Sequence, residues 1–214
     1  GRGRGELDAR IQDDAGDWRW ASWSCWRDRG TGRVGWSGRD VTERKNRESW
    51  LKEMAFTDPL TGLLNRRGFS VLSEKVSRVA AREGKGCLVM LADLDGMKWI
   101  NDVLGHDRGD EALRETAFLL KKRLRASDVV SRIGGDEFAA CLVADSEEVS
   151  GPIRRDLEKE VDSRNRREGR AYRLSLSLGF AWAEAGKVLV EDLIRRADES
   201  MYKEKWGRSG RALA

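Results

Sequence analysis

The ten residues SRIGGDEFAA, at positions 131–140, place two glycines and two adjacent carboxylates between short apolar runs. The flanking runs, VVSRI and EFAACLV, are typical of β-strands, and Gly134 and Gly135 suit the positive φ angles of a two-residue hairpin. The stretch therefore predicts a β-hairpin that presents Asp136 and Glu137 together at its turn. A solvated turn explains the two acids equally well, because Asp beside Gly is common in hairpins.

The composition narrows the class of protein. Of 214 residues, 39% are hydrophobic and 36% are charged, which is typical of a soluble globular protein with one well-buried domain and some further chain. Apolar runs such as CLVMLA reach only strand length and no signal-peptide pattern is visible, so we expect a cytoplasmic protein without direct membrane contact. Three cysteines without CxxC spacing indicate reduced, buried thiols. The net charge of +4 suits a phosphate-bearing ligand and does not alone exclude nucleic acid.

From residue 57 onward, helical and strand patterns alternate. Apolar residues recur at helical spacing in four segments, near residues 65–82, 113–124, 147–167 and 193–201. Strand patterns fall at residues 86–93, on both arms of the hairpin and at residues 171–183. The order βαββαβ predicts an α/β (α+β) fold of the ferredoxin or polymerase-palm type, with a central, antiparallel-containing sheet flanked by helices.

The first 42 residues differ in character from the rest. They are rich in Gly, Arg and Trp, and DWRWASWSCWRD followed by RVGWSGRDVTERK predicts a short hairpin of two strands. Residues 43–56 predict a connecting helix, with Leu51, Met54 and Ala55 on one side, of a kind that often pairs with a second copy. Residues 1–42 resemble the C-terminal part of a PAS sensory domain, whose last strand commonly runs into a segment like DVTERK.

A second acidic cluster follows the apolar strand predicted at residues 86–93. Asp93 would lie at the rim of the sheet, next to the central hairpin, so Asp93, Asp136 and Glu137 are expected to converge. Carboxylates without His or Cys partners favour a hard cation, and Mg²⁺ held by a few carboxylates and substrate phosphates is the usual arrangement. A solvated acidic rim is the simpler alternative.

Five motifs together carry a family resemblance. In chain order they are DPLTGLLNRR (58–67), DLDGMKWINDVLGHDRGDEAL (93–113), RIGGDEF (132–138), SLSLGFA (175–181) and RADESMYKEK (196–205). From residue 57 to the C-terminus the chain resembles the GGDEF domain of diguanylate cyclases. The resemblance implies a nucleotidyl-cyclase fold and condensation of two GTP into cyclic di-GMP, with release of two pyrophosphates. It also implies a homodimer and two Mg²⁺ ions per active site, with Mn²⁺ as a substitute, and we expect no nucleic-acid partner.

The same resemblance assigns the acidic residues. Asp93, the backbone carbonyl of Leu94, Asp136 and Glu137 would be metal ligands. Asp136, the third residue of the motif, is also a candidate general base, and this sequence has Asp there where relatives often have Glu. The shorter side chain favours metal ligation over proton abstraction.

Base recognition is expected from Asn101 and Asp110. A carboxylate accepts hydrogen bonds from N1–H and the exocyclic amine of guanine, whereas adenine has an acceptor at N1 and no amine at C2. Asp110 would therefore exclude ATP, and the Asn101 amide would add contacts to the same base. Helix capping by either residue is the structural alternative.

Cations are expected to hold the triphosphate. By resemblance, Lys98 steadies the phosphates in the transition state, and Lys205 and Arg208 bind the γ-phosphate. In KEKWGRSGR, one residue separates Lys205 from Gly207 where the family usually has two, so Lys203 or Arg211 could substitute.

Arg125 and Asp128 form an RxxD motif five residues before the Gly-Gly pair. At this spacing the family carries a product-binding site, so the resemblance implies feedback inhibition by cyclic di-GMP. A surface salt bridge between the two side chains is the alternative explanation. The alternative to an enzyme is a catalytically inactive GGDEF module that binds GTP or cyclic di-GMP as a regulatory receptor.

Overall fold

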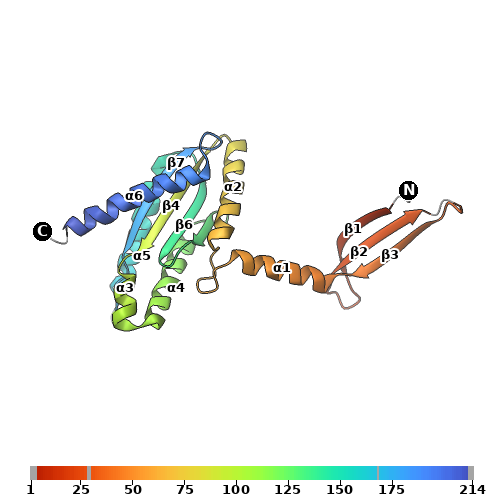
Figure 1. Cartoon of the computed structure of the whole chain (residues 1–214), viewed down its shortest axis with the longest axis horizontal. Helices are drawn as coiled ribbons and strands as arrows, with labels where there is room; N and C mark the ends of the chain where they lie inside the picture. Colours follow the sequence, from red (N-terminus) through yellow and green to blue (C-terminus); the bar gives the residue numbers. More distant parts are fainter. Residues whose placement is uncertain (1–3, 28–29, 168, 212–214) are drawn as a thin grey trace. The chain divides into compact units, whose positions relative to one another are not determined.

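The computed structural model describes residues 4–27, 30–167 and 169–211, and the side chains within them except at 4–5, 48–54 and 207–211 (Figure 1). The chain divides into two compact units, Gly1–Met54 and Ala55–Ala214. Within the described residues, no helix combines the length and the hydropathy that crossing a membrane would require.

The N-terminal unit holds a three-stranded antiparallel sheet. Its strands, in the order β1-β2-β3, are β1 (Arg4–Gln12), β2 (Trp18–Arg27) and β3 (Val34–Asp40). The predicted hairpin is present as the antiparallel pair of β2 and β3, and β1, which was not predicted, pairs with residues 18–26 of β2. The helix α1 (Thr42–Phe56) follows, and the expected apolar positions Leu51 and Met54 lie outside the described side chains.

The second unit confirms the predicted βαββαβ order. Its strands are β4 (Gly86–Leu94), β5 (Val129–Arg132), β6 (Glu137–Ala144) and β7 (Leu176–Glu184). Its helical segments are α2 (Arg66–Arg82), α3 (Met97–Trp99), the π-helical η1 (Ile100–Leu104), α4 (His106–Arg123), the 3₁₀ turn η2 (Glu147–Val149), α5 (Ser150–Asn165) and α6 (Val190–Arg211). The sheet order is β5-β6-β4-β7, with every neighbouring pair antiparallel.

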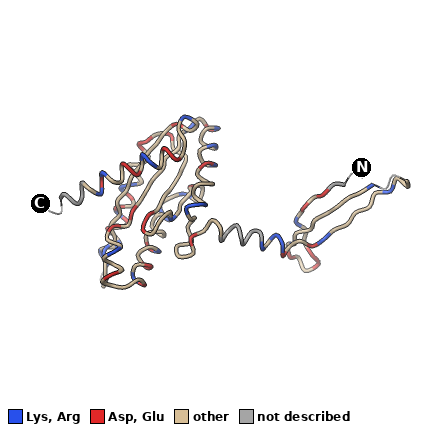
Figure 2. Tube along the Cα trace, viewed as in Figure 1, with Lys and Arg blue, Asp and Glu red and all other residues tan. Residues whose placement is uncertain are grey.

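Strand β4 is the centre of this sheet, and all nine of its residues are buried. Successive side chains of a strand point to opposite faces. One face, with Leu88 and Met90, packs in the core that α4 and α5 cover. The other, with Val89 and Leu91, belongs to the core that α2 and α6 cover. Charged residues occur only at or next to the ends of the four strands, as the colouring of Figure 2 shows, so the acids must gather at the rim.

The hairpin between β5 and β6 differs from the predicted two-residue turn. Its loop is four residues long, 133–136, and neither Gly134 nor Gly135 has a positive φ. The amides of Ile133 and Gly134 both donate to the carbonyl oxygen of Glu137, at 2.9 and 3.3 Å. A Cβ atom on Gly134 would lie 2.4 Å from Oε2 of Glu137, so this glycine makes room for the acid rather than supplying an unusual backbone angle.

Candidate active site

Strand pairing brings the predicted acidic residues together. Asp93 on β4 is the direct partner of Glu137 on β6, and the amide of Leu94 donates to the carbonyl oxygen of Asp136 at 3.0 Å. Residues directly opposite in an antiparallel pair point to the same face, so the side chains of Asp93 and Glu137 share the face that α6 covers. Asp93 is buried, Asp136 is half-buried and Glu137 is exposed, which gives a site open at the hairpin.

Two serines hold the neighbouring carboxylate of Asp95. Ser175 Oγ donates to Asp95 Oδ2 at 2.7 Å, and Ser177 Oγ donates to Asp95 Oδ1 at 2.8 Å. The amide of Asp95 also donates to the carbonyl oxygen of Ser175 at 2.9 Å. Sequence reasoning assigned no role to these three residues. The sequence does contain a signal for this contact, because polar residues alternate with leucine in both DLD (93–95) and SLS (175–177). In the sheet these two stretches pair, with Asp93 directly opposite Ser177.

Helix α6 brings a lysine into the same cluster. Lys205 Nζ lies 2.6 Å from Asp93 Oδ1. The helix reaches this position because it packs directly on the backbone of β7, where a Cβ on Gly179 would lie 2.0 Å from the carbonyl oxygen of Ala197. Sequence reasoning gave Gly179 no role, although a glycine in the middle of an apolar strand is a signal for close backbone approach.

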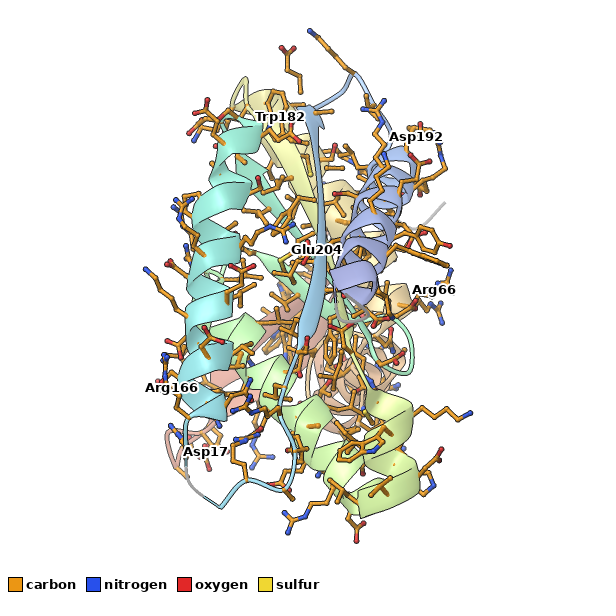
Figure 3. All side chains as sticks on the ribbon, turned by 90° about the vertical axis from the view of Figure 1, so that its left-hand side faces the viewer. Asp17, Arg66, Arg166, Trp182, Asp192 and Glu204 are labelled. Carbon is orange, nitrogen blue, oxygen red and sulfur yellow. The ribbon has the colours of Figure 1, made fainter. Side chains whose placement is uncertain are left out.

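An ion pair across the sheet edge fixes the same part of α6. Arg154 of α5 pairs with Glu204 of α6 and donates to the carbonyl oxygen of Leu178 at 2.9 Å. Figure 3 shows Glu204 at the edge strand β7, between α5 and α6. The pair therefore anchors α6 one residue before Lys205.

The charges of this cluster influence one another. Burial raises the pKa of Asp93, as do the charges of Asp136 and Asp95, although the hydrogen bond from Lys205 acts in the opposite direction. Burial would lower the pKa of Lys205, but the hydrogen bond to Asp93 and the surrounding carboxylates outweigh it and raise that pKa. The carboxylates of Asp93, Asp95 and Asp136 together thus favour a positively charged group among them, as Lys205 is.

The residues expected to recognise the base lie on two consecutive helical segments after β4, Asn101 on η1 and Asp110 on α4. A Cβ on Gly109 of α4 would lie 2.0 Å from Asn101 Oδ1. The Asn101 amide therefore rests on the bare backbone of Gly109, beside Asp110. Asp110 Oδ2 lies 3.5 Å from Arg114 Nη2. Since the α4 N-cap is Gly105, without a side-chain cap, Asp110 does not cap this helix.

Three of the expected phosphate-binding cations, Lys98, Lys203 and Lys205, have described side chains. Lys98 lies on α3, directly after the β4 loop, and is exposed. Lys203 is also exposed on α6, whereas Lys205 contacts Asp93. The side chains of Arg208 and Arg211 lie outside the described residues.

Comparison with known proteins agrees with this arrangement. Residues 55–211 match the family model described as diguanylate cyclase, GGDEF domain. The chain belongs to the GGDEF family. It is 36% identical over 167 residues to diguanylate cyclase DgcP of Pseudomonas aeruginosa, and this alignment covers 75% of this chain and 24% of DgcP. It is 33% identical over 175 residues to diguanylate cyclase DgcM of Escherichia coli K12, which covers 82% of this chain and 42% of DgcM.

A solved structure gives the same fold for the GGDEF domain. The coiled coil and GGDEF domain of DgcB from Caulobacter crescentus, in complex with c-di-GMP, superimposes with a TM-score of 0.70 at 27% identity. The match covers 78% of this chain and 89% of the DgcB chain. The chain thus spans less than half the length of the curated relatives above, and most of a solved GGDEF structure.

The RxxD motif of this GGDEF domain lies between α4 and β5. Asp128 Oδ2 accepts from the backbone amide of Arg125 at 2.8 Å, and Ser127 Oγ donates to Asp128 Oδ1 at 3.4 Å. The ion pairs of the described residues include none between the two RxxD side chains, so the salt-bridge alternative was wrong. Both residues line a groove of about 660 Å³ that also contains Lys75 and Lys85.

The donor atoms at the GGDEF hairpin suit a hard divalent cation. The carboxylates of Asp93, Asp136 and Glu137 and the carbonyl of Leu94 offer oxygen atoms, the donor type that Mg²⁺ prefers. Among the described side chains, however, no three from His, Cys, Asp and Glu lie close enough to form a ready-made metal cluster. The residue types fit Mg²⁺ or Mn²⁺, with phosphates and water completing the shell.

Proposed function

We propose that this GGDEF domain is an active diguanylate cyclase, which condenses two GTP into cyclic di-GMP and releases two pyrophosphates. The observation that carries the proposal is the pairing of Asp93 with Glu137 across β4 and β6, next to Asp136. The acidic set separates this function from an inactive receptor for GTP or cyclic di-GMP, which would not need every one of these carboxylates.

In each half-reaction a 3′-hydroxyl attacks an α-phosphorus, and pyrophosphate leaves. Asp93, the carbonyl of Leu94, Asp136 and Glu137 would hold Mg²⁺, which when bound activates the hydroxyl and stabilises charge on the phosphates. Asp136 is placed at the hairpin, where its carboxylate could accept the hydroxyl proton. Lys98, Lys205 and Arg208 would neutralise and orient the triphosphate.

Guanine selection would come from Asp110 and Asn101. The carboxylate of Asp110 would accept from N1–H and the exocyclic amine, and a base without these donors would leave it unpaired. The Asn101 amide, held on Gly109, would contact the same base. ATP is then a poor substrate because it pairs with neither group correctly.

Each domain would bind one GTP, so two domains must face each other for the reaction. Dimerisation is then part of the chemistry, because the attacking hydroxyl and the α-phosphate belong to different chains. We propose that α1 pairs with its copy and that the N-terminal sheet is the end of a PAS-like sensory domain. Such a domain would regulate activity by changing how the helices pair.

Product inhibition would act at Arg125 and Asp128. The guanidinium offers a planar fork to guanine acceptors and phosphate, and the carboxylate of Asp128 accepts from guanine donors. Cyclic di-GMP bound in this groove would fix two domains in an arrangement that keeps their GTP sites apart.

The direct test is to incubate the purified chain with GTP and Mg²⁺ and to resolve the products by chromatography. Cyclic di-GMP and pyrophosphate should form in the parent and not in Asp93→Asn. Guanine-selective GTP binding without any product in the parent would establish the inactive receptor instead.

A further inference from the structure

Lys205 already provides a positive charge inside the acidic site. Its ammonium donates to Asp93 Oδ1 at 2.6 Å, in a position where the side chain of Asp93 is 11% exposed and that of Lys205 is 47% exposed. The charges of Asp95 and Asp136 also act on this lysine. The most buried carboxylate of the site is therefore paired with an ammonium from α6.

A neighbouring acid of the site, Asp95, is also held by hydrogen bonds within the protein. Both carboxylate oxygens of Asp95 accept hydrogen bonds from serine hydroxyls, which fix the orientation of this side chain. No three acidic side chains of the described residues are assembled into a metal cluster. The negative charge of Asp93 is thus balanced by Lys205, and the described side chains form no prearranged metal cluster around it.

We propose that Lys205 acts as an internal counter-ion that keeps divalent cations off Asp93 until a triphosphate draws its ammonium away. The inference rests on the proposed cyclase function and adds an order to it: the metal enters together with the nucleotide. An ammonium and Mg²⁺ compete for the same carboxylate, because two cations in contact with one oxygen repel each other. A triphosphate removes the competition, since it offers Lys205 other anionic oxygens.

The fold restricts the switch to the lysine side chain. Helix α6 is fixed by its close contact at Gly179 and by the Arg154–Glu204 pair. The half-exposed Lys205 can therefore exchange partners without a helix movement. Linkage requires that nucleotide and metal strengthen each other's binding by the same factor.

The test is a titration of the nucleotide-free chain with Mn²⁺, with free Mn²⁺ followed by electron paramagnetic resonance. Lys205→Gln should bind Mn²⁺ about tenfold more tightly than the parent, within the usual range of coupling between two sites. Lys205→Arg should remain near the parent because it keeps the charge. Arg196→Gln, an exposed change on the same helix at a residue with no expected role in the site, is the control and should also match the parent.

A second titration contains a GTP analogue with a non-reactive α,β-methylene link. The analogue should raise the Mn²⁺ affinity of the parent strongly and that of Lys205→Gln much less. Equal or weaker Mn²⁺ binding by nucleotide-free Lys205→Gln would overturn the counter-ion role. Binding that is unchanged in Asp93→Asn would instead show that the proposed metal site itself is misplaced.

Discussion

Arg132 Nη1 lies 3.3 Å from each carboxylate oxygen of Asp58, and this contact joins the segment after α1 to the hairpin between β5 and β6. The same guanidinium donates to the carbonyl oxygen of Gly135 from Nε at 3.0 Å and from Nη2 at 2.7 Å. Asp58 in turn accepts from the amide and hydroxyl of Thr61, at 2.9 and 2.6 Å. One arginine therefore holds the loop that carries Asp136.

The first prediction concerns this contact. Asp58→Asn should lower the free energy of unfolding by about 1–3 kcal/mol, because it weakens hydrogen bonds to a charged group whose side chain is 17% exposed. Urea unfolding measures the change. Glu74→Gln is the control, since its partner Arg78 is 73% exposed and such pairs contribute at most about 1 kcal/mol. Equal losses in both variants would contradict a structural role for the Asp58–Arg132 pair.

The second prediction concerns pH and the Glu115 cluster. Glu115 accepts from Arg164 at 3.0 Å, from Arg170 at 2.5 Å and from Tyr172 at 3.4 Å. Burial would raise the pKa of Glu115, but Arg170 and Arg164 outweigh it and hold that pKa below the usual 4.5. Burial, followed by the Glu115 charge, raises the pKa of Tyr172 to about 12, so the tyrosine stays neutral.

A carboxylate with a depressed pKa stabilises the fold above its unfolded-state pKa, and this stabilisation disappears as the pH falls through the folded-state value. The free energy of unfolding should therefore decrease as the pH falls below about 4.5, with a further contribution from Asp58, whose pKa is also lowered. Urea titrations at successive pH values measure this decrease. Glu115→Gln should be less stable near neutrality and should show a shallower decrease, and an unchanged slope would exclude Glu115 as a cause.

The third prediction tests the contact between β7 and α6. Gly179→Ala adds a Cβ where the carbonyl oxygen of Ala197 stands 2.0 Å away, so α6 must shift. We expect a loss of about 1–3 kcal/mol in stability and weaker binding of the triphosphate, because Lys205 moves with the helix. Gly151→Ala in α5 is the matched control. Its Cβ would meet only Arg155 Nη1 at 3.4 Å, so it should affect stability and triphosphate binding much less than Gly179→Ala.

The fourth prediction concerns base selection. Asp110→Ala should weaken GTP binding about tenfold or more and should relax the discrimination against ATP, because no carboxylate then opposes the adenine acceptor. Competition by ATP in the cyclase assay measures the discrimination. Asp107→Ala, an exposed acid in the first turn of the same helix, should leave both values unchanged. Equally poor competition by ATP in parent and Asp110→Ala would remove Asp110 from guanine recognition.

The fifth prediction concerns product inhibition. In progress curves with added cyclic di-GMP, the parent should slow at low micromolar product or below, and Arg125→Ala should continue at its initial rate, because the groove loses its guanidinium. Lys121→Ala, an exposed change in the last turn of α4, should slow like the parent. If the parent and Arg125→Ala show the same sensitivity, the RxxD motif is not the inhibitory site.

The sequence predicted the strands best where burial alone determines them. The apolar run of β4 and the two arms of the hairpin were placed within a residue or two. Strand β1 was missed, although Leu7, Ala9 and Ile11 alternate with charged residues at the strand period. Apolar residues that alternate singly with charged residues are a weak signal for a strand. Such a segment becomes a strand only through its pairing with β2, which the sequence of β1 alone does not show.

The site was predictable in its residue types and less so in its contacts. The pairing of Asp93 with Glu137 follows from strand order and length, which the sequence indicates. The predicted turn geometry was wrong because Gly134 provides space for the Glu137 side chain and does not have a positive φ. The residue type alone does not show for which of these two reasons a glycine is present. The Lys205–Asp93 contact depends on how closely α6 approaches β7, a backbone distance that side-chain patterns do not encode.

The register of β4 against β6 makes assembly of the acid pair an all-or-none event. A slip by one residue would place Asp136 or Phe138 opposite Asp93 and turn Glu137 to the other face. No intermediate spacing of the two carboxylates exists, because strand pairing changes only in whole residues. Substitutions that weaken the core of the sheet should therefore reduce the fraction of molecules in which the acid pair is assembled, without changing the spacing of the two carboxylates in the others.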